Sequence, residues 1–310
     1  MHRKQLLLAI LSVIAVLALV TACAAPAPAA ADLLAEVKAR GTLVIATDPA
    51  YPPQSELAPD GKRAENTKCA SDQHTATEFQ GFDIDASVEV AKRLGVEACF
   101  VTPNWDLITV GNWSGRWDIS IGSMTPLPER VKVLYFSQPY YAVPAQFYIH
   151  SDNTTFTKVE DLSGKKVGSC KDCTYDKYLM GALELFAQAV DFKVKDAVLT
   201  GYGTDIEAAE DLKLGDGIRL DGILTSQTAG AGWIKDGYPV KPLGDPVFYE
   251  YNAAAVDKAS PKDSRSLIDE VTRIIQEMHK DGALKASAEK WFGVDIATPA
   301  ASFDVSLLYK

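Results

Sequence analysis

Two cysteines three positions apart, Cys170 and Cys173, form the most chemically distinctive short pattern in the chain. A C-x-x-C pair can bind a metal ion, catalyse thiol–disulfide exchange or close a structural disulfide. A zinc site needs two further ligands, and none of the four histidines lies near the pair at ligand spacing. The pair follows a strand-like stretch and opens a helix-like one, so thioredoxin-like redox chemistry stays an alternative. The pattern favours a structural disulfide.

The first residues of the chain predict export. Arg3 and Lys4 precede an apolar run over residues 6–20, and "VTAC" then ends at Cys23. This order is typical of a secretory signal, and the run is shorter than the roughly 20 residues that span a membrane. Small residues before a cysteine have the form of a lipobox. We therefore expect residues 1–22 to be a lipoprotein signal peptide and Cys23 to carry lipid; an uncleaved anchor helix and an ordinary signal are the alternatives.

The stretch after Cys23 begins with "AAPAPAAAD". It has no apolar pattern to bury, so we expect residues 23–39 to be a lipid-tethered Ala/Pro linker. The protein is then exported and lipid-anchored to the outer face of the cytoplasmic membrane, in the periplasm if the cell is Gram-negative. Four cysteines remain, an even number in a compartment that permits disulfides. Three pairings are open, and we expect Cys69–Cys99 and Cys170–Cys173.

Composition and charge limit the class of protein. Hydrophobic residues make up 47% of the chain, which is enough for a globular core. The net charge of −10 argues against binding to nucleic acid or to membranes through a basic surface. It says little about a ligand, because the charge of a pocket is local.

Short apolar runs alternate with amphipathic stretches, which predicts an α/β fold. Residues 42–47 have the pattern of a buried strand, and residues 83–94 have that of an amphipathic helix. After the extended segment "AVPAQFYIHSD" a second α/β set begins, in which we expect a helix from Thr174 to Gln188. A second extended segment, "FYEYNAAAVDK", then leads back.

Two lobes joined by these two extended crossings are the simplest arrangement. We expect lobe 1 to comprise residues 40–143 and 250–310, and lobe 2 to comprise residues 144–249. The polar, turn-rich residues 54–79 interrupt the pattern. A long loop of this kind is usually functional, disordered or clamped, and a Cys69–Cys99 disulfide would clamp it to lobe 1.

Four phrases in order identify a family resemblance: "TDPAYPP", "GFDIDASVEVAKRLGV", "WDISIGSMTPLPERVKVLYFSQPYY" and "MHKDGALKASAEKWFG". From residue 41 to residue 293 the chain resembles the bacterial extracellular solute-binding proteins of family 3, which supply polar amino acids to ABC importers. The resemblance implies two flavodoxin-like lobes that close about a hinge on a small ligand. It also agrees with a lipid anchor.

The resemblance implies roles for residues of lobe 1. Arg130 matches the arginine that holds the ligand's α-carboxylate, and its planar fork of donors suits that group. Ser123, Met124 and Thr125 form the turn after "WDISIG", where hydroxyls and backbone N–H groups would complete the carboxylate's partners. An ordinary surface arginine and ordinary turn residues are the alternatives.

Three more residues of lobe 1 match ligand-binding positions. Tyr51 and Trp105 fall where the family sandwiches the ligand between aromatic side chains, although either could belong to the core. Asp48 matches an acidic position that meets a polar or cationic ligand tail, although it could also cap a turn.

In lobe 2 the chain departs from the family twice. Asp172, Cys173 and Thr174 match a Gly-Thr-Thr loop that closes over the ligand, with Asp172 in place of the glycine. Ser226 stands where the family has an aspartate that pairs with the ligand's α-amino group. Either Asp172 binds the ammonium, which we favour because it explains both departures, or the ligand has no α-amino group.

The resulting hypothesis is the substrate-binding component of an ABC importer that captures an amino acid or a related small carboxylate by hinge closure. We expect as partners this amino-acid-like ligand, ABC permease subunits and the membrane through the lipid anchor, but no nucleic acid, and we expect a monomer. No catalytic residue, cofactor or metal is expected. A periplasmic enzyme of the same fold, resembling a dehydratase, and a ligand sensor domain are the alternatives.

Overall fold

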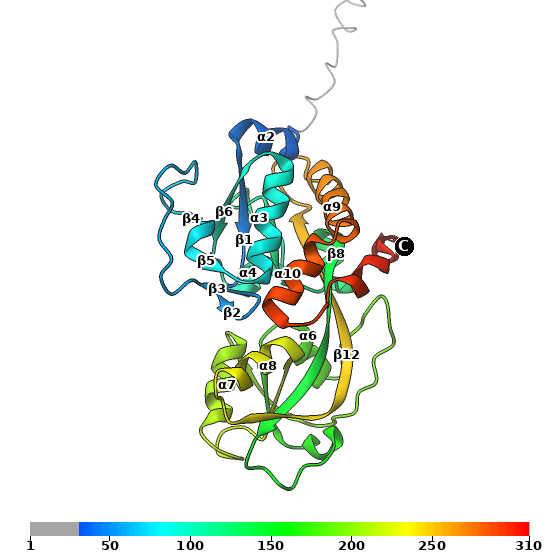
Figure 1. Ribbon diagram of the computed structural model, residues 1–310. Coiled ribbons are helices and arrows are strands. Elements are labelled where there is room, and N and C mark those ends of the chain that lie inside the picture. The colour runs from blue at the N-terminus through cyan, green and yellow to red at the C-terminus, as the bar shows by residue number, and fades with distance from the viewer. Residues whose placement is uncertain (1–30, 310) are drawn as a thin grey trace, which may run out of the picture. The chain divides into compact units, whose positions relative to one another are not determined.

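The computed structural model describes residues 31–309. Its longest strands, β8 (Leu134–His150) and β12 (Val240–Asp257), pair with each other in antiparallel orientation (Figure 1). They coincide with the two extended segments of the sequence. β12 also pairs with β7 (Ile119–Met124), and β8 also pairs with β11 (Gly222–Ser226). Because these partners lie on opposite sides of the pair, β8 and β12 join two lobes through one nine-stranded sheet of order β10-β9-β11-β8-β12-β7-β1-β6-β4.

Lobe 1 is the part built on β1, β6 and β7. β1 runs parallel to both neighbours and all five of its residues are buried, as expected for a parallel strand covered on both faces. Besides β7, the elements of lobe 1 are α2 (Leu33–Arg40), β1 (Thr42–Ala46), β2 (Ala50–Tyr51), β3 (Ser55–Leu57), β4 (His74–Thr75), η1 (Ala76–Glu78), β5 (Phe79–Gln80), α3 (Phe82–Leu94), β6 (Glu97–Val101), α4 (Trp105–Thr109), α5 (Pro128–Val133), α9 (Arg265–Lys280), α10 (Ala283–Phe292), η3 (Thr298–Ser302) and η4 (Val305–Tyr309).

The clearest helix of the sequence, α9, shows how lobe 1 is held together. Its apolar residues recur at helical spacing and all are buried in one cluster with side chains of α3 and α10. These residues of α9 are Leu267, Ile268, Val271, Ile274, Ile275 and Met278. Trp113 and Trp117 belong to a second cluster, which includes Val44 and Ala46 of β1.

Lobe 2 is the part built on β9, β10 and β11, with β9 parallel to both of the others. Ala208 and Ala209 of α7 and Trp233 of α8 pack around Tyr148, whereas Tyr178 of α6 belongs to a separate cluster. The elements are η2 (Val159–Leu162), β9 (Lys166–Cys170), α6 (Thr174–Leu179), β10 (Val198–Tyr202), α7 (Asp205–Lys213), β11 (Gly222–Ser226) and α8 (Gln227–Lys235). The α/β class and the two-lobed arrangement agree with the sequence prediction.

The helix predicted from Thr174 to Gln188 is wrong in length, because α6 ends at Leu179. Gly181 follows in the left-handed region, with φ of 69°. A helix commonly stops where glycine adopts this conformation. The residues up to β10 are irregular apart from their turns.

The linker predicted over residues 23–39 extends too far. The side chain of Asp32 accepts a hydrogen bond of 3.0 Å from the Ala35 amide and caps α2. Leu33 and Val37, one helical turn apart, are buried in the core of lobe 1. Residues from 33 onward therefore belong to the folded lobe. The predicted signal peptide and Cys23 lie outside the described residues.

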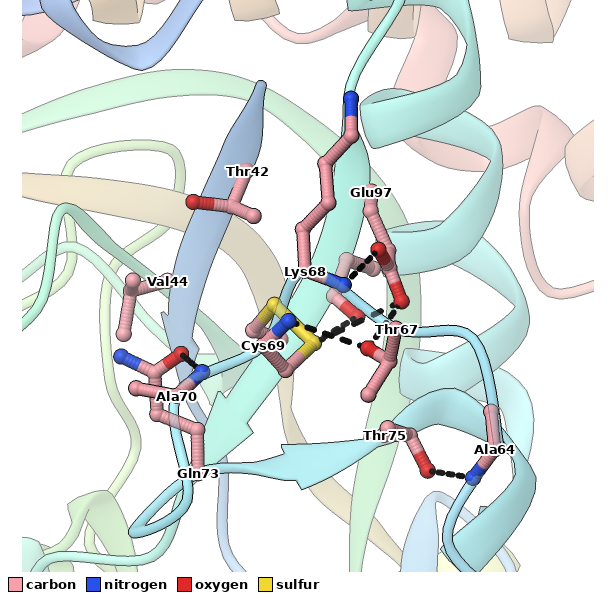
Figure 2. The surroundings of a disulfide bond; sticks show 12 residues. Thr42, Val44, Ala64, Thr67, Lys68, Cys69, Ala70, Gln73, Thr75 and Glu97 are labelled. Carbon is pink, nitrogen blue, oxygen red and sulfur yellow. Dashed lines mark hydrogen bonds between the residues drawn. A yellow bond between two sulfur atoms is a disulfide. The ribbon is translucent and has the colours of Figure 1, made fainter. Parts of the chain in front are cut away.

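The polar segment of residues 54–79 is clamped to lobe 1. A disulfide joins Cys69 to Cys99 of β6, and Cys170 is joined to Cys173. Figure 2 shows Glu97, at the start of β6, accepting hydrogen bonds from the Thr67 hydroxyl and, at 2.8 Å, from the Lys68 amide. β4 adds antiparallel pairing to β6. The polar segment is thus held by covalent and polar bonds, and at its end by the buried side chain of Phe79.

No helix within residues 31–309 has the length and apolar character needed to cross a membrane.

Removing the Cys69–Cys99 disulfide should destabilise the protein more than removing the other. The cysteines are 30 residues apart, against 3 for Cys170–Cys173. Loop-closure entropy then predicts losses of roughly 4 and about 2 kcal/mol in the free energy of unfolding. Urea unfolding of the oxidised Cys69→Ala/Cys99→Ala and Cys170→Ala/Cys173→Ala variants measures both. Equal losses, or a larger loss for the second variant, would contradict this expectation.

Candidate functional site

A cavity lies where several strands of both lobes end. Asp48 follows β1, Thr125 follows β7, Cys173 follows β9 and Asp205 follows β10, and all four line the cavity. Loops at the carboxyl ends of parallel strands are the usual ligand sites of α/β folds. Eight of the eleven predicted ligand-binding residues line it: Asp48, Tyr51, Trp105, Ser123, Thr125, Arg130, Cys173 and Thr174.

Arg130 is the buried cation of this cavity. It lies in α5, is only 3% exposed and donates hydrogen bonds to the carbonyl oxygens of Thr125, at 3.0 Å, and Asp172, at 2.8 Å. Its guanidinium also lies 5.4 Å from the ring centre of Trp105. Burial lowers the pKa of Arg130 to about 10, so the side chain stays charged at neutral pH. These two bonds use two of the five N–H donors of a guanidinium.

Direct hydrogen bonds join the lobes beside the cavity. The Tyr51 hydroxyl of lobe 1 donates to the Ser226 hydroxyl of lobe 2 at 2.7 Å, and it lies 3.3 Å from the Tyr175 hydroxyl. Gln54 donates to the Thr228 hydroxyl at 2.7 Å. The bond from Arg130 to the Asp172 carbonyl also crosses between the lobes. The lobes are therefore in contact around the cavity.

An ion pair lies on the rim of this contact. Lys177 of α6 and Glu129 of α5 approach to 2.9 Å, and both side chains are partly exposed. The pair lowers the pKa of Glu129, although burial acts in the opposite direction and is the larger single effect.

The cavity is rich in carboxyl groups. Asp83 of α3 is 1% exposed and accepts hydrogen bonds from the hydroxyls of Ser123, at 2.6 Å, and Tyr140, at 2.8 Å. Burial raises the pKa of Asp83 to about 7, against the lowering effect of these hydroxyls, and the nearby Asp48 adds to the rise.

Asp205 is the first residue of α7 and is 7% exposed. Its Oδ1 atom is buried without a hydrogen-bond partner among the described residues. Burial raises the pKa of Asp205 to about 7, and the negative charges of Asp48 and Glu250 raise it further, against a lowering influence of the nearby Thr225. Burial also raises the pKa of Asp48.

Glu250 of β12 bridges the lobes. Its carboxyl accepts hydrogen bonds from the hydroxyls of Thr125 in lobe 1, at 3.2 Å, and of Thr174 and Tyr175 in lobe 2. Burial raises the pKa of Glu250, while these hydroxyls and the charge of Arg130 lower it. The hydroxyls of Thr125 and Thr174 thus serve an internal carboxyl group.

Three predicted residues do not line the cavity. Met124 is fully buried in the core of lobe 1, because its place on β7 turns it toward Phe136 and Trp113. The hydroxyl of Ser226 is covered by Tyr51 and also accepts the Ala229 amide at the start of α8. The Ser226 hydroxyl therefore has its partners within the protein and does not line the cavity.

Asp172 is the third of these residues, and its side chain is exposed outside the cavity. Its backbone is left-handed, with φ of 60°, a conformation that aspartate tolerates better than most residues. This explains why aspartate can stand where the family has glycine. Asp172 meets Arg130 through its carbonyl, so the expected binding of an ammonium by its carboxylate is not supported.

Sequence reasoning missed most of the acidic groups. Asp83, Asp205 and Glu250 line the cavity together with Tyr175, Gly122, Cys170, Gly203 and Thr204. Asp205 carried a usable signal, because it follows the strand "VLTGY" at the edge where α/β sheets bind ligands. Asp83 and Glu250 lay within a helix and a crossing, where nothing local marks a ligand site.

The described residues contain no group of three or more His, Cys, Asp or Glu side chains arranged to hold a metal ion.

Comparison with known proteins identifies the family. The model of the bacterial extracellular solute-binding proteins, family 3, matches residues 43–294. The chain belongs to this family. The L-cystine-binding protein TcyJ of Escherichia coli (strain K12) is 32% identical over 93% of this chain and 96% of its own length.

Two solved structures share the family fold. An ancestral arginine-binding protein bound to arginine has 29% identity and a TM-score of 0.65, over 82% of this chain and 99% of that one. The ancestral amino acid-binding protein AncCDT-1, described as a precursor of cyclohexadienyl dehydratase, has 28% identity and a TM-score of 0.67, over 84% and 99%.

The stability of the solute-free protein should fall as the pH rises from about 5 to about 8. Asp83 and Asp205 titrate near pH 7 when folded, whereas an unfolded aspartate titrates near 3.9. Between these values the folded state holds protons that the unfolded state has lost, so the free energy of unfolding decreases with pH. Urea unfolding at several pH values measures this slope.

Asp205→Asn should remove about half of this decrease, because two carboxyl groups with similar pKa values contribute to it. Asp245→Asn, at an exposed position of lobe 2, is the matched control and should keep the wild-type slope. A slope that Asp205→Asn leaves unchanged would show that Asp205 is ionised in the folded protein.

Proposed function

We propose that the protein is the solute-binding component of an ABC importer and that it captures an amino acid or a related small carboxylate by closing its lobes. Family membership and the name of the cystine-binding relative support this role. The cavity supports it independently, because it combines a buried guanidinium with several carboxyl groups. An amino acid carries the complementary pair of charges.

Arg130 is the observation that carries the proposal. Its guanidinium is already oriented by the carbonyls of Thr125 and Asp172, and its remaining donors suit a carboxylate. Buried charges are costly unless they are paired. Glu250, the acid of the cavity lining whose charge acts on Arg130, is itself occupied by three hydroxyls. A solute carboxylate would therefore find a prepared cation.

The arrangement of β8 and β12 supports closure about these two strands. The register between them shifts between Leu243 and Phe248 and again near Asn252 and Ala253, so the ladder is interrupted where the chain passes between the lobes. Such irregularities are places where a hinge can bend. Solute that contacts both lobes favours the closed state by its greater affinity for it.

The division of the chain follows from the same proposal. Residues 40–143 with 250–310 form one moving lobe and residues 144–249 the other, with the folded part of lobe 1 beginning earlier, at α2. Permease subunits would contact the closed protein as a monomer. Cys23 would carry the lipid that keeps it at the outer face of the membrane.

Arg130→Ala should weaken binding of the solute by about 2–5 kcal/mol, roughly 30-fold to several thousand-fold in Kd, because a buried charge partner is lost. Arg130→Lys should fall between this variant and the wild type, since it keeps the charge but not the planar fork. Calorimetric titration with amino acids selected by thermal shift measures the effect; a solute at about 100 times its Kd adds roughly 2.7 kcal/mol of stability. Arg116→Ala, which removes a lobe 1 guanidinium that packs on Trp117, is the control. Unchanged affinity in Arg130→Ala would refute this role of Arg130.

Cys23→Ser should release the exported protein from the membrane. A lipidated chain partitions into detergent, whereas a chain without lipid stays in the aqueous phase. Cloud-point extraction of cells that express the wild type or the variant compares the two. Equal partition of both proteins into the aqueous phase would contradict lipidation at Cys23.

An enzymatic role is the second candidate. Asp83 and Asp205 have pKa values of about 7, the range in which a carboxyl group can act as a general acid. The resemblance to a dehydratase precursor gives this candidate a structural parallel. Incubation of the pure protein with its solute, followed by mass spectrometry, separates the candidates, because a transport receptor returns the solute unchanged.

A further inference from the structure

The disulfide between Cys170 and Cys173 belongs both to the lining of the cavity and to the core of lobe 2. The two cysteines line the cavity and are buried, at 9% and 6% exposed. They also belong to the apolar cluster of lobe 2 that contains Tyr175 and Tyr178. The disulfide is therefore fixed to the packed part of lobe 2 at the place where that lobe meets the cavity.

The loop that this disulfide closes presents a carbonyl group to Arg130. The carbonyl belongs to Asp172, whose backbone has a φ of 60°, a conformation that is unfavourable for most residues other than glycine. The Asp172 amide donates to the Asp176 carboxylate at 2.6 Å, and the Lys171 amide donates to the Tyr202 carbonyl at 2.8 Å. Two hydrogen bonds and the disulfide thus hold a backbone conformation that is costly by itself.

Arg130 makes one hydrogen bond to each lobe. Its guanidinium donates to the Thr125 carbonyl within lobe 1, at 3.0 Å, and to the Asp172 carbonyl of lobe 2, at 2.8 Å. Trp105 lies against the guanidinium as well, but a ring contact does not select which donors face the cavity. A planar fork binds a carboxylate through two parallel hydrogen bonds only when its direction is set. Without the bond to Asp172, the guanidinium can turn about the bond to Thr125.

From this geometry we infer that the Cys170–Cys173 disulfide is a positioning element for solute binding. It holds the Asp172 carbonyl where that group orients Arg130, and it thereby raises the affinity of the closed protein for a carboxylate. The inference rests on the proposed function and adds the disulfide to its binding apparatus. Because the bond from Arg130 to Asp172 joins the two lobes, the disulfide acts on the closed state and slows release of the solute.

Comparison of the two disulfides tests this inference. The oxidised Cys170→Ala/Cys173→Ala and Cys69→Ala/Cys99→Ala variants are titrated by calorimetry with an amino acid that stabilises the wild type in a thermal-shift screen. The first variant should bind about tenfold more weakly or worse, the size of a lost hydrogen bond to a charged group. The second should keep the wild-type Kd, although it is expected to lose more stability. A loss below about threefold in the first variant, or equal losses in both, overturns the inference.

A double-mutant cycle tests whether the disulfide acts through Arg130. In the Arg130→Ala background, replacing Cys170 and Cys173 by alanine should change Kd by less than about twofold. Thermal shift at rising solute concentration measures this weaker binding. A loss as large as in the wild-type background overturns the inference, because the disulfide then acts elsewhere.

The same variants separate this inference from the proposed function. If Arg130→Ala alone binds as tightly as the wild type, the proposed role of Arg130 fails, and the inference fails with it. If Arg130→Ala binds weakly and Cys170→Ala/Cys173→Ala binds like the wild type, only the inference fails.

Reduction gives a second measurement that keeps both cysteines of the loop. In the Cys69→Ala/Cys99→Ala protein, dithiothreitol transfers two electrons and two protons to the remaining disulfide, so that Cys170 and Cys173 become thiols and the reagent forms its own cyclic disulfide. Alkylation followed by mass spectrometry counts the thiols. The reduced protein should bind the solute as weakly as Cys170→Ala/Cys173→Ala, and reoxidation should restore the affinity. An affinity that reduction leaves unchanged overturns the inference.

Discussion

The antiparallel pairing of β8 with β12 positions the whole cavity. Both strands run through both lobes within the one nine-stranded sheet, and residues of the loops after β1, β7, β9 and β10 line a common cavity. Glu250 lies on β12 itself and holds hydroxyls of both lobes. The backbone connection and the polar contacts of the cavity are therefore parts of one arrangement, and a change in the register of this pair would displace every wall of the cavity.

Electrostatics then decides what the cavity can accept. Most buried polar groups in it are already matched within the protein: Asp83 with two hydroxyls, Glu250 with three, and Tyr51 with Ser226. Among the charged groups of the lining, Arg130 keeps donors that its two hydrogen bonds do not use, and Asp205 keeps a buried Oδ1 atom without a partner among the described residues. Because unmatched buried charge is costly, these two groups, rather than the full lining, are where solute binding gains most.

Features of the fold that depend on hydrophobic periodicity and on the ends of strands could be predicted from the sequence. The α/β class, the two crossings and the strand that begins at residue 42 agree with the structure, and Arg130 lines the cavity. The end of α6 was missed because a single left-handed glycine, Gly181, outweighs a helical pattern that continues in the sequence.

Contacts between residues far apart in the chain explain why the other predictions for the site differ from the structure. The direction of the Asp172 side chain depends on its positive φ, and the burial of Ser226 depends on Tyr51, 175 residues away in the chain. The place of Asp205 after a strand end could have been noticed in the sequence, but the influence of Asp48 and Glu250 on its pKa comes from distant parts of the chain, which no local pattern reveals. A family resemblance indicates where a ligand binds, but it assigns roles only to the positions that match the family's motifs. It therefore missed Asp205, which lines the same cavity from a loop outside those motifs.

The rim pair of Lys177 and Glu129 gives the protein a sensitivity to ionic strength. The pair is partly exposed, so dissolved ions screen it, whereas the buried carboxyl groups of the cavity are screened much less. Salt would loosen the outer contact between the lobes and leave the inner charges nearly at full strength. In a dilute medium the rim pair assists closure, whereas in a saline one closure depends almost entirely on the contacts of the interior.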